Sequence, residues 1–344
     1  MTTSFSSLPV VDVGCLASEA SEQELAALSK RLHDVFATTG FAYLTNAPLS
    51  YSHEQVLNMS RDFFALPNEE KMKLAKRSFR RDHKNTYRGY FPTQPELAND
   101  NLKEGFEIGP SQPIQTQSTT SSKFNLSEPN VWPDATIFPT RSALETLYIE
   151  LQALASKLLS LLAISLDKPA DYFAPYLDES LSTLRLLHYP ANASVASGSG
   201  PASGSEAKLS CTPHTDSGIL TLLHQDSSGG LEVRNSRGEW VSAPYIPGSI
   251  VVNIGDLMAK VSGGRFVATM HRVRAPGLNA SASSIGKLGG EDRGLGRLSV
   301  PFFFEPGENC LVRSVNGDEG FVVYGEHVRA KMKTWVEFQD DEDR

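Results

Sequence analysis

Two polar side chains stand at the start of an apolar, strand-like run in the second half of the chain. His214 and Asp216 directly precede or open the run "SGILTLLHQ", where a purely structural strand would carry apolar residues. Residues two apart on a strand point to the same face of a sheet, so these two side chains are expected to project side by side. An imidazole and a carboxylate placed in this way are two ligands for a divalent first-row metal ion.

A metal site of this kind needs a third protein ligand, and the best candidate is His271. It begins another β-type run, "HRVRAP", further along the chain. Two histidines and one carboxylate on a common face form the facial triad of non-heme Fe(II) oxygenases, which leaves coordination positions open. Asp256 in "NIGDLM" is a competing carboxylate, but no histidine stands two positions away, so we expect it to end a strand in a turn.

A second pair of polar residues lies on a later strand, "GRLSVPFFF". Arg297 and Ser299 are two apart and therefore face one way. Arginine offers a permanently charged planar fork to a carboxylate, and a serine hydroxyl adds a hydrogen bond. An inward-facing arginine is costly unless it meets an anion. The sequence therefore predicts a metal site and an acid-binding site at opposite ends of one small cavity, which a dicarboxylate would span.

The elements that must position these residues fall into two halves. In the first half, helices are expected within 21–40 and 52–67, each with capping-box spacing at its start, and an apolar leucine stripe predicts a long support helix from 140 to 166. A short strand is expected at 41–47. The segment from about 80 to 133 is expected to be irregular, which in a compact region is typical of functional loops.

From about residue 180 onward, short β-type runs follow one another and are separated by Gly, Pro and Asp. Such a series predicts a sandwich or barrel. Two inserts poor in apolar residues, at 193–208 and 277–296, are predicted to be flexible surface loops. A C-terminal helix is expected in "GEHVRAKMKTWVEF".

The order of motifs resembles one family over nearly the whole chain. The matching stretches are "LPVVDV", "TTGFAYLTN", "FFALPNEEK", "RGYFP", "LRLLHYPA", "PHTDSGILTLLHQD", "GGLEV", "SIVVNIGDLM", "FVATMHRV" and "RLSVPFFFEP". The chain resembles the 2-oxoglutarate and Fe(II)-dependent dioxygenase superfamily, in the branch that contains isopenicillin N synthase, plant flavonoid and hormone oxygenases, fungal natural-product oxygenases and fungal thymine 7-hydroxylase.

This resemblance implies an α+β fold with a distorted double-stranded β-helix, or jelly roll, as its core and helices flanking it. We expect an N-terminal helical region at 1–135, a support helix with its connection at 136–178, the jelly-roll domain at 179–308, and a C-terminal strand and helix at 309–344. It also implies an enzyme that oxidises a C–H bond of a small molecule, most simply by hydroxylation, while 2-oxoglutarate and O2 yield succinate and CO2. Ascorbate is expected to stimulate turnover.

The resemblance assigns roles to individual residues. It implies that His214, Asp216 and His271 bind iron, and that Arg297, Ser299 and Tyr189 contact 2-oxoglutarate. Strand alternation adds candidate substrate contacts on the same inner faces, and neighbouring loops add others; these candidates are Arg185, Ser217, Phe303 and Arg88.

Two positions depart from the family pattern. Many relatives have Asn two positions before the tyrosine of "HYP", where this chain has Leu187, so the resemblance does not extend to a supporting hydrogen bond to the cosubstrate at this position. Thymine 7-hydroxylase carries an aromatic residue directly after the aspartate ligand, where this chain has Ser217, which argues against thymine as the substrate. Flexible inserts and the branch resembled favour a fungal-type enzyme of secondary metabolism.

Composition limits the classes of partner. The chain has 344 residues and a formal net charge of −8, which disfavours nucleic-acid binding because phosphate contacts need clustered basic residues. Three scattered cysteines, no signal-like N-terminus and no long apolar run predict a cytoplasmic protein without a membrane span or disulfide framework. A monomer or weak homo-oligomer is expected.

Three other functions remain open from the sequence. One is an iron oxidase that does not use 2-oxoglutarate, as in isopenicillin N synthase, which shares the Arg-x-Ser pair. Another is a non-catalytic binding module on the same fold. The third uses the same chemistry for desaturation, ring closure or ring expansion.

Overall fold

The computed structural model describes residues 3–94, 102–111, 125–190, 209–274, 296–317 and 320–333. Its α-helices are α1 (Glu22–Thr38), α2 (His53–Phe64), α3 (Asn68–Met72), α4 (Arg141–Ser165), α5 (Asp256–Val261) and α6 (Tyr324–Met332). Two short 3-10 helices, η1 and η2, cover Gly14–Ala17 and Ala174–Tyr176.

Eight strands form a main sheet in the order β1-β2-β10-β7-β12-β5-β4-β3. Only the β1–β2 pair is parallel among the pairings of this sheet in the described residues. The strands are β1 (Val10–Asp12), β2 (Phe41–Thr45), β3 (Gly89–Phe91), β4 (Glu104–Ile108), β5 (Thr183–Tyr189), β7 (Leu220–Gln225), β10 (Ile250–Ile254) and β12 (Arg297–Phe304).

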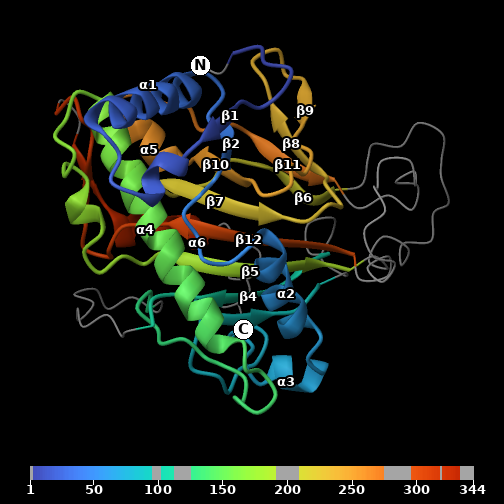
Figure 1. The fold of residues 1–344 in the computed structure, drawn as a ribbon. Coiled ribbons are helices and arrows are strands. Elements are labelled where there is room, and N and C mark those ends of the chain that lie inside the picture. The colour runs from blue at the N-terminus through green and yellow to red at the C-terminus, as the bar shows by residue number, and fades with distance from the viewer. Residues whose placement is uncertain are drawn as a thin grey trace, which may run out of the picture.

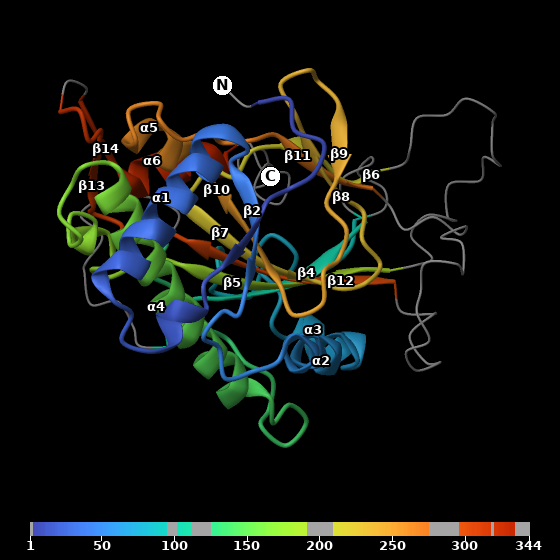
Figure 2. The same cartoon turned by 45° about the horizontal axis from the view of Figure 1, so that its top comes forward.

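A second sheet has the order β6-β11-β8-β9. Its strands are β6 (Leu209–His214), β8 (Leu231–Arg234), β9 (Trp240–Ser242) and β11 (His271–Arg274), and a separate hairpin joins β13 (Leu311–Arg313) to β14 (Phe321–Val323). Figure 2 shows the four-stranded sheet on the side of the main sheet away from α2 and α4. Two mainly antiparallel layers with helices outside them agree with the predicted α+β class.

Helices cover the outer face of the main sheet. Figure 1 shows α4 lying across the strands, with α2 beside it. The capping boxes expected at Ser21 and Ser52 are both present, and they start α1 and α2. The leucine stripe of α4 is buried in the same core as Leu186, Val300 and Phe302 of the sheet. These helices therefore fix the sheet from outside and leave its inner face to line the space between the sheets.

The predicted irregular segment contains two strands, β3 and β4, at the edge of the main sheet. The prediction was wrong here because β4 carries Glu104 and Glu107, whose charges conceal the strand pattern. Both carboxylates are buried in ion pairs, with Lys71 and Lys76 respectively. The N-terminal region, expected to be helical, thus also supplies four strands of this sheet, and the predicted four-part division of the chain stays a prediction.

Helix α4 is long and apolar enough, by length and composition alone, to cross a membrane, which the sequence reading had not anticipated. Its buried leucines belong to the core that covers the main sheet, as expected of a support helix. The inserts at 193–208 and 277–296 lie outside the described residues, except for Gly296, and so does the end of the expected C-terminal helix beyond residue 333.

Candidate metal centre

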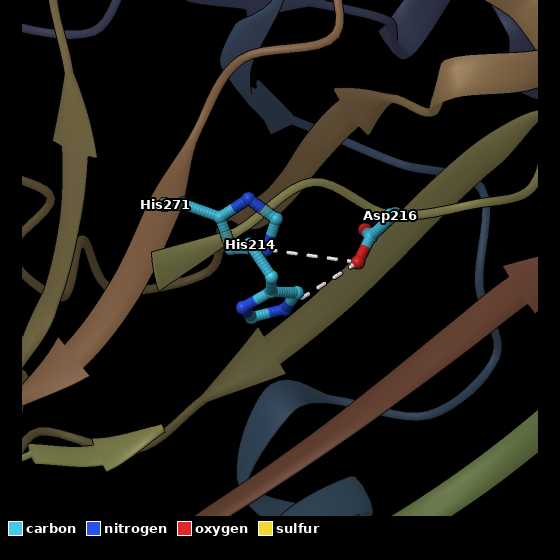
Figure 3. A group of neighbouring side chains, drawn as sticks. All are labelled: His214, Asp216 and His271. Carbon is cyan, nitrogen blue, oxygen red and sulfur yellow. Dashed lines mark ion pairs between the residues drawn. The ribbon is translucent and has the colours of Figure 1, made fainter. Parts of the chain in front are cut away.

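Three predicted ligands converge at one end of the second sheet. His214 is the last residue of β6 and His271 the first of β11, and the two stand opposite each other in the antiparallel register. Asp216 lies two residues beyond β6, in the turn that leads to β7. Its Oδ1 is 3.8 Å from Nε2 of His214 and 3.6 Å from Nε2 of His271 (Figure 3). The ligand atoms all lie within 4.8 Å of one another.

Backbone carbonyl groups set the orientation of both imidazoles. Nδ1 of His214 is 2.8 Å from the Thr212 carbonyl oxygen, and Nδ1 of His271 is 3.1 Å from the Thr269 carbonyl oxygen. A carbonyl oxygen can only accept, so each Nδ1 carries a proton, and Nε2 is the nitrogen that can present a lone pair to a metal ion. Both Nε2 atoms face the carboxylate, as metal ligation requires.

Two donors fix the carboxylate of Asp216. Its Oδ2 accepts hydrogen bonds from Thr221 Oγ1 at 2.6 Å and from Asn253 Nδ2 at 2.8 Å, so Oδ1 is the oxygen turned to the histidines. Burial opposes ionisation, but His271, His214 and these two donors outweigh it and lower the pKa of Asp216. An anionic ligand with one oriented oxygen fits a divalent cation.

The sequence reading missed these orienting residues, although a signal for two of them was present. Thr221 and Asn253 are polar residues inside otherwise apolar strands, and the β7–β10 register places them directly opposite each other. Two polar residues that lie opposite each other in otherwise apolar strands therefore indicate that both bind the same polar group. The roles of the Thr212 and Thr269 carbonyl groups cannot be predicted from the sequence, because every residue has a carbonyl group.

The predicted acid-binding residues are also brought together. Arg297 is buried, donates from Nε to the Gly229 carbonyl oxygen at 2.8 Å, and donates from Nη1 to Ser299 Oγ at 3.3 Å. Its guanidinium lies 4.9 Å from the ring centroid of Tyr189, which stands opposite it in the β5–β12 register. Within the described ranges, no aspartate or glutamate forms an ion pair with Arg297. A buried guanidinium without a carboxylate partner fits a bound acid.

The inner wall between these sites is partly apolar. Leu187, which stands where many relatives have Asn, is buried in a cluster with Phe91 and Tyr189. It lies opposite Ser299 in the β5–β12 register, so the alternation predicted for these strands places it on the inner face. Phe303 is partly buried on the same face, opposite Thr183 and Thr221.

The remaining candidates occupy different places. Arg185 lies on the inner face of β5 and forms an ion pair with Glu107. Ser217 directly follows Asp216, and its carbonyl oxygen is 3.2 Å from Nε2 of His327 on α6. Helix α6 therefore packs against the loop that carries Asp216.

Arg88 is buried beside the start of β5. Its guanidinium is buried and donates to Thr183 Oγ1 at 2.5 Å and to the Leu181 carbonyl oxygen at 2.8 Å. A substrate contact of Arg88 stays a prediction. The observed partners give this side chain another role, which is to fix the start of β5.

Three other histidines contact residues outside the triad. His188 points to the outer face, as the alternation predicts, and its Nδ1 is 2.7 Å from Glu104. His53 and His224 approach each other at 3.2 Å between their Nδ1 atoms, and burial lowers the pKa of His224 to about 3. Among the described residues, the only cluster of three metal-type ligands is the predicted one.

Comparison with known proteins agrees with this geometry. The model of the 2OG-Fe(II) oxygenase superfamily matches residues 182–306, and that of the N-terminal region of non-haem dioxygenases in morphine synthesis matches residues 8–135. A 2-oxoglutarate-dependent dioxygenase of Didymella fabae is 33% identical to the chain, covering 79% of this chain and 82% of the relative. The chain belongs to the 2OG-Fe(II) oxygenase superfamily.

Other similar proteins match over almost the full length. A homoarginine-6-hydroxylase of Glycine max is 28% identical, covering 97% of this chain and 98% of the relative. The crystal structure of a full-length Neurospora crassa protein in complex with alpha-KG and thymine superposes with a TM-score of 0.74 at 26% identity, covering 97% and 99% of the two chains. A putative 2OG-Fe(II) oxygenase family protein of Caulobacter crescentus gives a TM-score of 0.75 at 25% identity, covering 96% and 100%.

These likenesses confirm the α+β fold with a jelly-roll core. They also confirm the enzyme class, a 2-oxoglutarate-dependent non-heme iron dioxygenase, and Fe(II) and 2-oxoglutarate as the cofactor and cosubstrate that its centre fits. The triad supplies two imidazoles and one carboxylate, the donor set expected for Fe(II).

Proposed function

We propose that this oxygenase hydroxylates a C–H bond of a small organic molecule in fungal-type secondary metabolism, in the cytoplasm, and releases succinate and CO2 from 2-oxoglutarate. The proposal rests on the presence of two features in the same jelly-roll core. One is the His214, Asp216 and His271 cluster, and the other is the buried Arg297 with no carboxylate partner in the described residues.

In this proposal the triad holds Fe(II), and Arg297 with Ser299 holds the distal carboxylate of 2-oxoglutarate beside Tyr189. Bound Fe(II) supplies the oxidative chemistry, in which 2-oxoglutarate is decarboxylated and the substrate loses hydrogen. The chain contributes geometry: the carbonyl groups of Thr212 and Thr269 keep the proton of each imidazole on Nδ1 and away from the metal side. Leu187 keeps water away from the inner wall because it offers no polar atom.

Two lines of similarity support the proposal. Relatives matched over nearly their whole length are named homoarginine-6-hydroxylases, and fungal relatives are named 2-oxoglutarate-dependent dioxygenases. We further propose that the substrate lies against Arg185, Phe303 and Ser217, with Arg88 fixing the strand beneath them. We expect the enzyme to act as a monomer or weak homo-oligomer, and ascorbate to stimulate turnover by keeping iron reduced.

The test is a screen of a fungal metabolite extract with the purified enzyme, Fe(II) and O2, with and without 2-oxoglutarate. A product that gains one oxygen atom only when 2-oxoglutarate is present supports the proposal. Turnover without 2-oxoglutarate would instead indicate an iron oxidase, and loss of two hydrogen atoms would indicate desaturation or ring closure. His214→Ala and Asp216→Ala are expected to abolish substrate-coupled succinate formation, and wild-type rates in either variant would contradict the assigned ligands.

A further inference from the structure

Residues 216–218, which we call the Asp216 loop, are bound on one side by helix α5. The Asp216 carbonyl oxygen accepts a hydrogen bond from the Asp256 N–H group at 2.7 Å, and the Gly218 carbonyl oxygen accepts one from the Leu257 N–H group at 3.1 Å. Asp256 and Leu257 are the first two residues of α5, where N–H groups have no partner within the helix. Helix α5 therefore fixes the first and the last carbonyl group of the loop.

A side chain of helix α6 binds the carbonyl group between them. The Ser217 carbonyl oxygen lies 3.2 Å from Nε2 of His327. A carbonyl oxygen can only accept, so Nε2 of His327 carries a proton and donates the hydrogen bond. Three successive carbonyl groups of the Asp216 loop are thus bound, two by α5 and one by α6. These bonds restrain the rotation of the peptide groups that follow Asp216.

Asp216 depends on such restraints because it lies beyond the end of β6 and outside the registered pairs of β6 and β7. The hydrogen bonds from Thr221 and Asn253 restrain Oδ2 of its side chain. The hydrogen bond from His327 restrains the main chain that carries this side chain. The two kinds of restraint act on different torsion angles, and both bear on where Oδ1 points.

Helix α6 is held in place by contacts that do not involve His327. The Tyr324 N–H group donates to the Cys310 carbonyl oxygen at 3.0 Å, and the Gly325 N–H group donates to the Glu308 carbonyl oxygen at 2.8 Å. Gly325 permits this approach, because a Cβ atom there would lie 2.7 Å from Cγ of Glu308. The core also buries three side chains of the helix, those of Tyr324, Val328 and Met332. Loss of the His327 hydrogen bond is therefore not expected to unfold α6.

The same face of α6 also reaches α5. Lys331 follows His327 by four residues, so both side chains lie on one face of the helix. Nζ of Lys331 is 3.6 Å from Oδ2 of Asp256, whose N–H group binds the Asp216 carbonyl oxygen. This ion pair is partly exposed, and such pairs contribute little. His327 is therefore the main link from α6 to the Asp216 loop.

We propose that His327 is a positioning residue for Fe(II), because it holds the main chain of Asp216 through the Ser217 carbonyl group and so couples α6 to the metal centre. The inference rests on the proposed function, in which His214, Asp216 and His271 hold Fe(II). Coupling between two sites is reciprocal, so binding of Fe(II) must in turn make α6 more resistant to local opening.

The first measurement is the Fe(II) dissociation constant of the whole chain, obtained without O2 by competition with a coloured chelator. His327→Leu leaves an apolar side chain and removes the donor. It should raise this constant by roughly 3- to 10-fold, as expected for the loss of one neutral hydrogen bond. His327→Gln places an amide N–H group at a similar reach, so its dissociation constant should stay within about 2-fold of the wild type.

The second measurement is amide hydrogen exchange of α6, with and without saturating Fe(II). In the wild type and in His327→Gln, Fe(II) should slow exchange in Tyr324–Met332, whereas in His327→Leu this protection should be lost. A residue that only stabilised α6 would change exchange equally in both conditions. His33→Leu is the matched control, because His33 is also half-buried on a helix beside an aromatic ring, that of Phe266.

The outcomes separate this inference from the proposed function. A wild-type protein that does not bind Fe(II), or that shows no visible absorption of an Fe(II)–2-oxoglutarate complex, would refute the proposed function and this inference with it. If the wild type binds Fe(II) but His327→Leu binds it as tightly as His33→Leu does, only the inference is wrong. It is also wrong if His327→Gln loses as much affinity as His327→Leu, or if Fe(II) protects α6 equally in the wild type and in His327→Leu.

Discussion

The two donors that orient Asp216 offer a direct test of how the site gains its affinity for Fe(II). Thr221→Val exchanges a hydroxyl for a methyl group of similar size, and Asn253→Ala removes the amide. Both donors reach the same oxygen, Oδ2, at 2.6 Å and 2.8 Å. Either change therefore leaves the carboxylate charged but with a single partner, free to turn away from the histidines.

The expected loss follows from the kind of bond removed. A hydrogen bond to a charged group contributes about 1.5–3 kcal/mol, which corresponds to roughly 10- to 100-fold in a binding constant. Residues that orient metal ligands in other proteins show the same range of about 10–100-fold in metal affinity. The double variant should lose less than the product of the two single losses, because both donors restrain one atom and their effects are coupled.

The measurement is the dissociation constant for Fe(II), obtained without O2 by competition with a coloured chelator. Ser249→Ala is the control, because Ser249 precedes the same strand as Asn253 and loses only a hydrogen bond to the Ile246 carbonyl oxygen. We expect Fe(II) binding by this control to equal that of the wild type. If folded Thr221→Val and Asn253→Ala proteins bind Fe(II) as tightly as the control, the two donors do not set the affinity and the reasoning fails.

Two further predictions concern charges outside the metal ligands. Arg297→Leu should raise the 2-oxoglutarate concentration for half-maximal succinate formation by roughly 30-fold or more, because truncating one partner of a buried charge pair costs about 2–5 kcal/mol. If that concentration is unchanged in the variant, the 2-oxoglutarate carboxylate binds elsewhere. Burial opposes ionisation of Glu104, but hydrogen bonds from His188, Lys71 and Tyr90 lower its pKa to about 2. Ionised Glu104 therefore adds about 3 kcal/mol at most to the free energy of unfolding. This contribution is fully present above the ordinary carboxyl pKa and is lost as the pH falls toward 2. The difference in unfolding temperature between wild type and Glu104→Gln should shrink from about pH 5 to about pH 3, and a constant difference would contradict the assigned cause.

The metal centre could be predicted from the sequence because few residue types ligate Fe(II) and strand geometry restricts where they point. Asp216 lies beyond the end of β6 and not on the strand, yet the two-residue spacing still brings it to the same side as His214. The third ligand was found because β11 also begins with a histidine. In each case a local pattern carried the information, since the proposed partner of each side chain is a metal ion and not another residue.

The charged strand β4 was not predicted, for the opposite reason. Glu104 and Glu107 belong to β4, but their partners Lys71 and Lys76 lie about 30 positions earlier, and no periodicity connects them. A buried ion pair looks like two exposed charges until both partners are placed in space. The alternation of β5 correctly predicted the face of Arg185, but the carboxylate that holds it could not be inferred.

The inner face of the main sheet carries two arginines, Arg185 and Arg297, that differ in their partners. Arg297 has no carboxylate partner in the described residues, while Arg185 already pairs with Glu107. Dianionic 2-oxoglutarate should bind more tightly to Arg297 than to Arg185. The guanidinium of Arg185 already pairs with the carboxylate of Glu107, and this carboxylate repels a second one. We therefore expect the cosubstrate to bind at Arg297 and not at Arg185 in the wild-type enzyme. Glu107→Gln removes that repulsion, so we expect 2-oxoglutarate to bind a second time in this variant, at Arg185, and to inhibit at high concentration. Succinate formation measured against rising 2-oxoglutarate should then pass through a maximum in the variant, and a plateau like that of the wild type would contradict the argument.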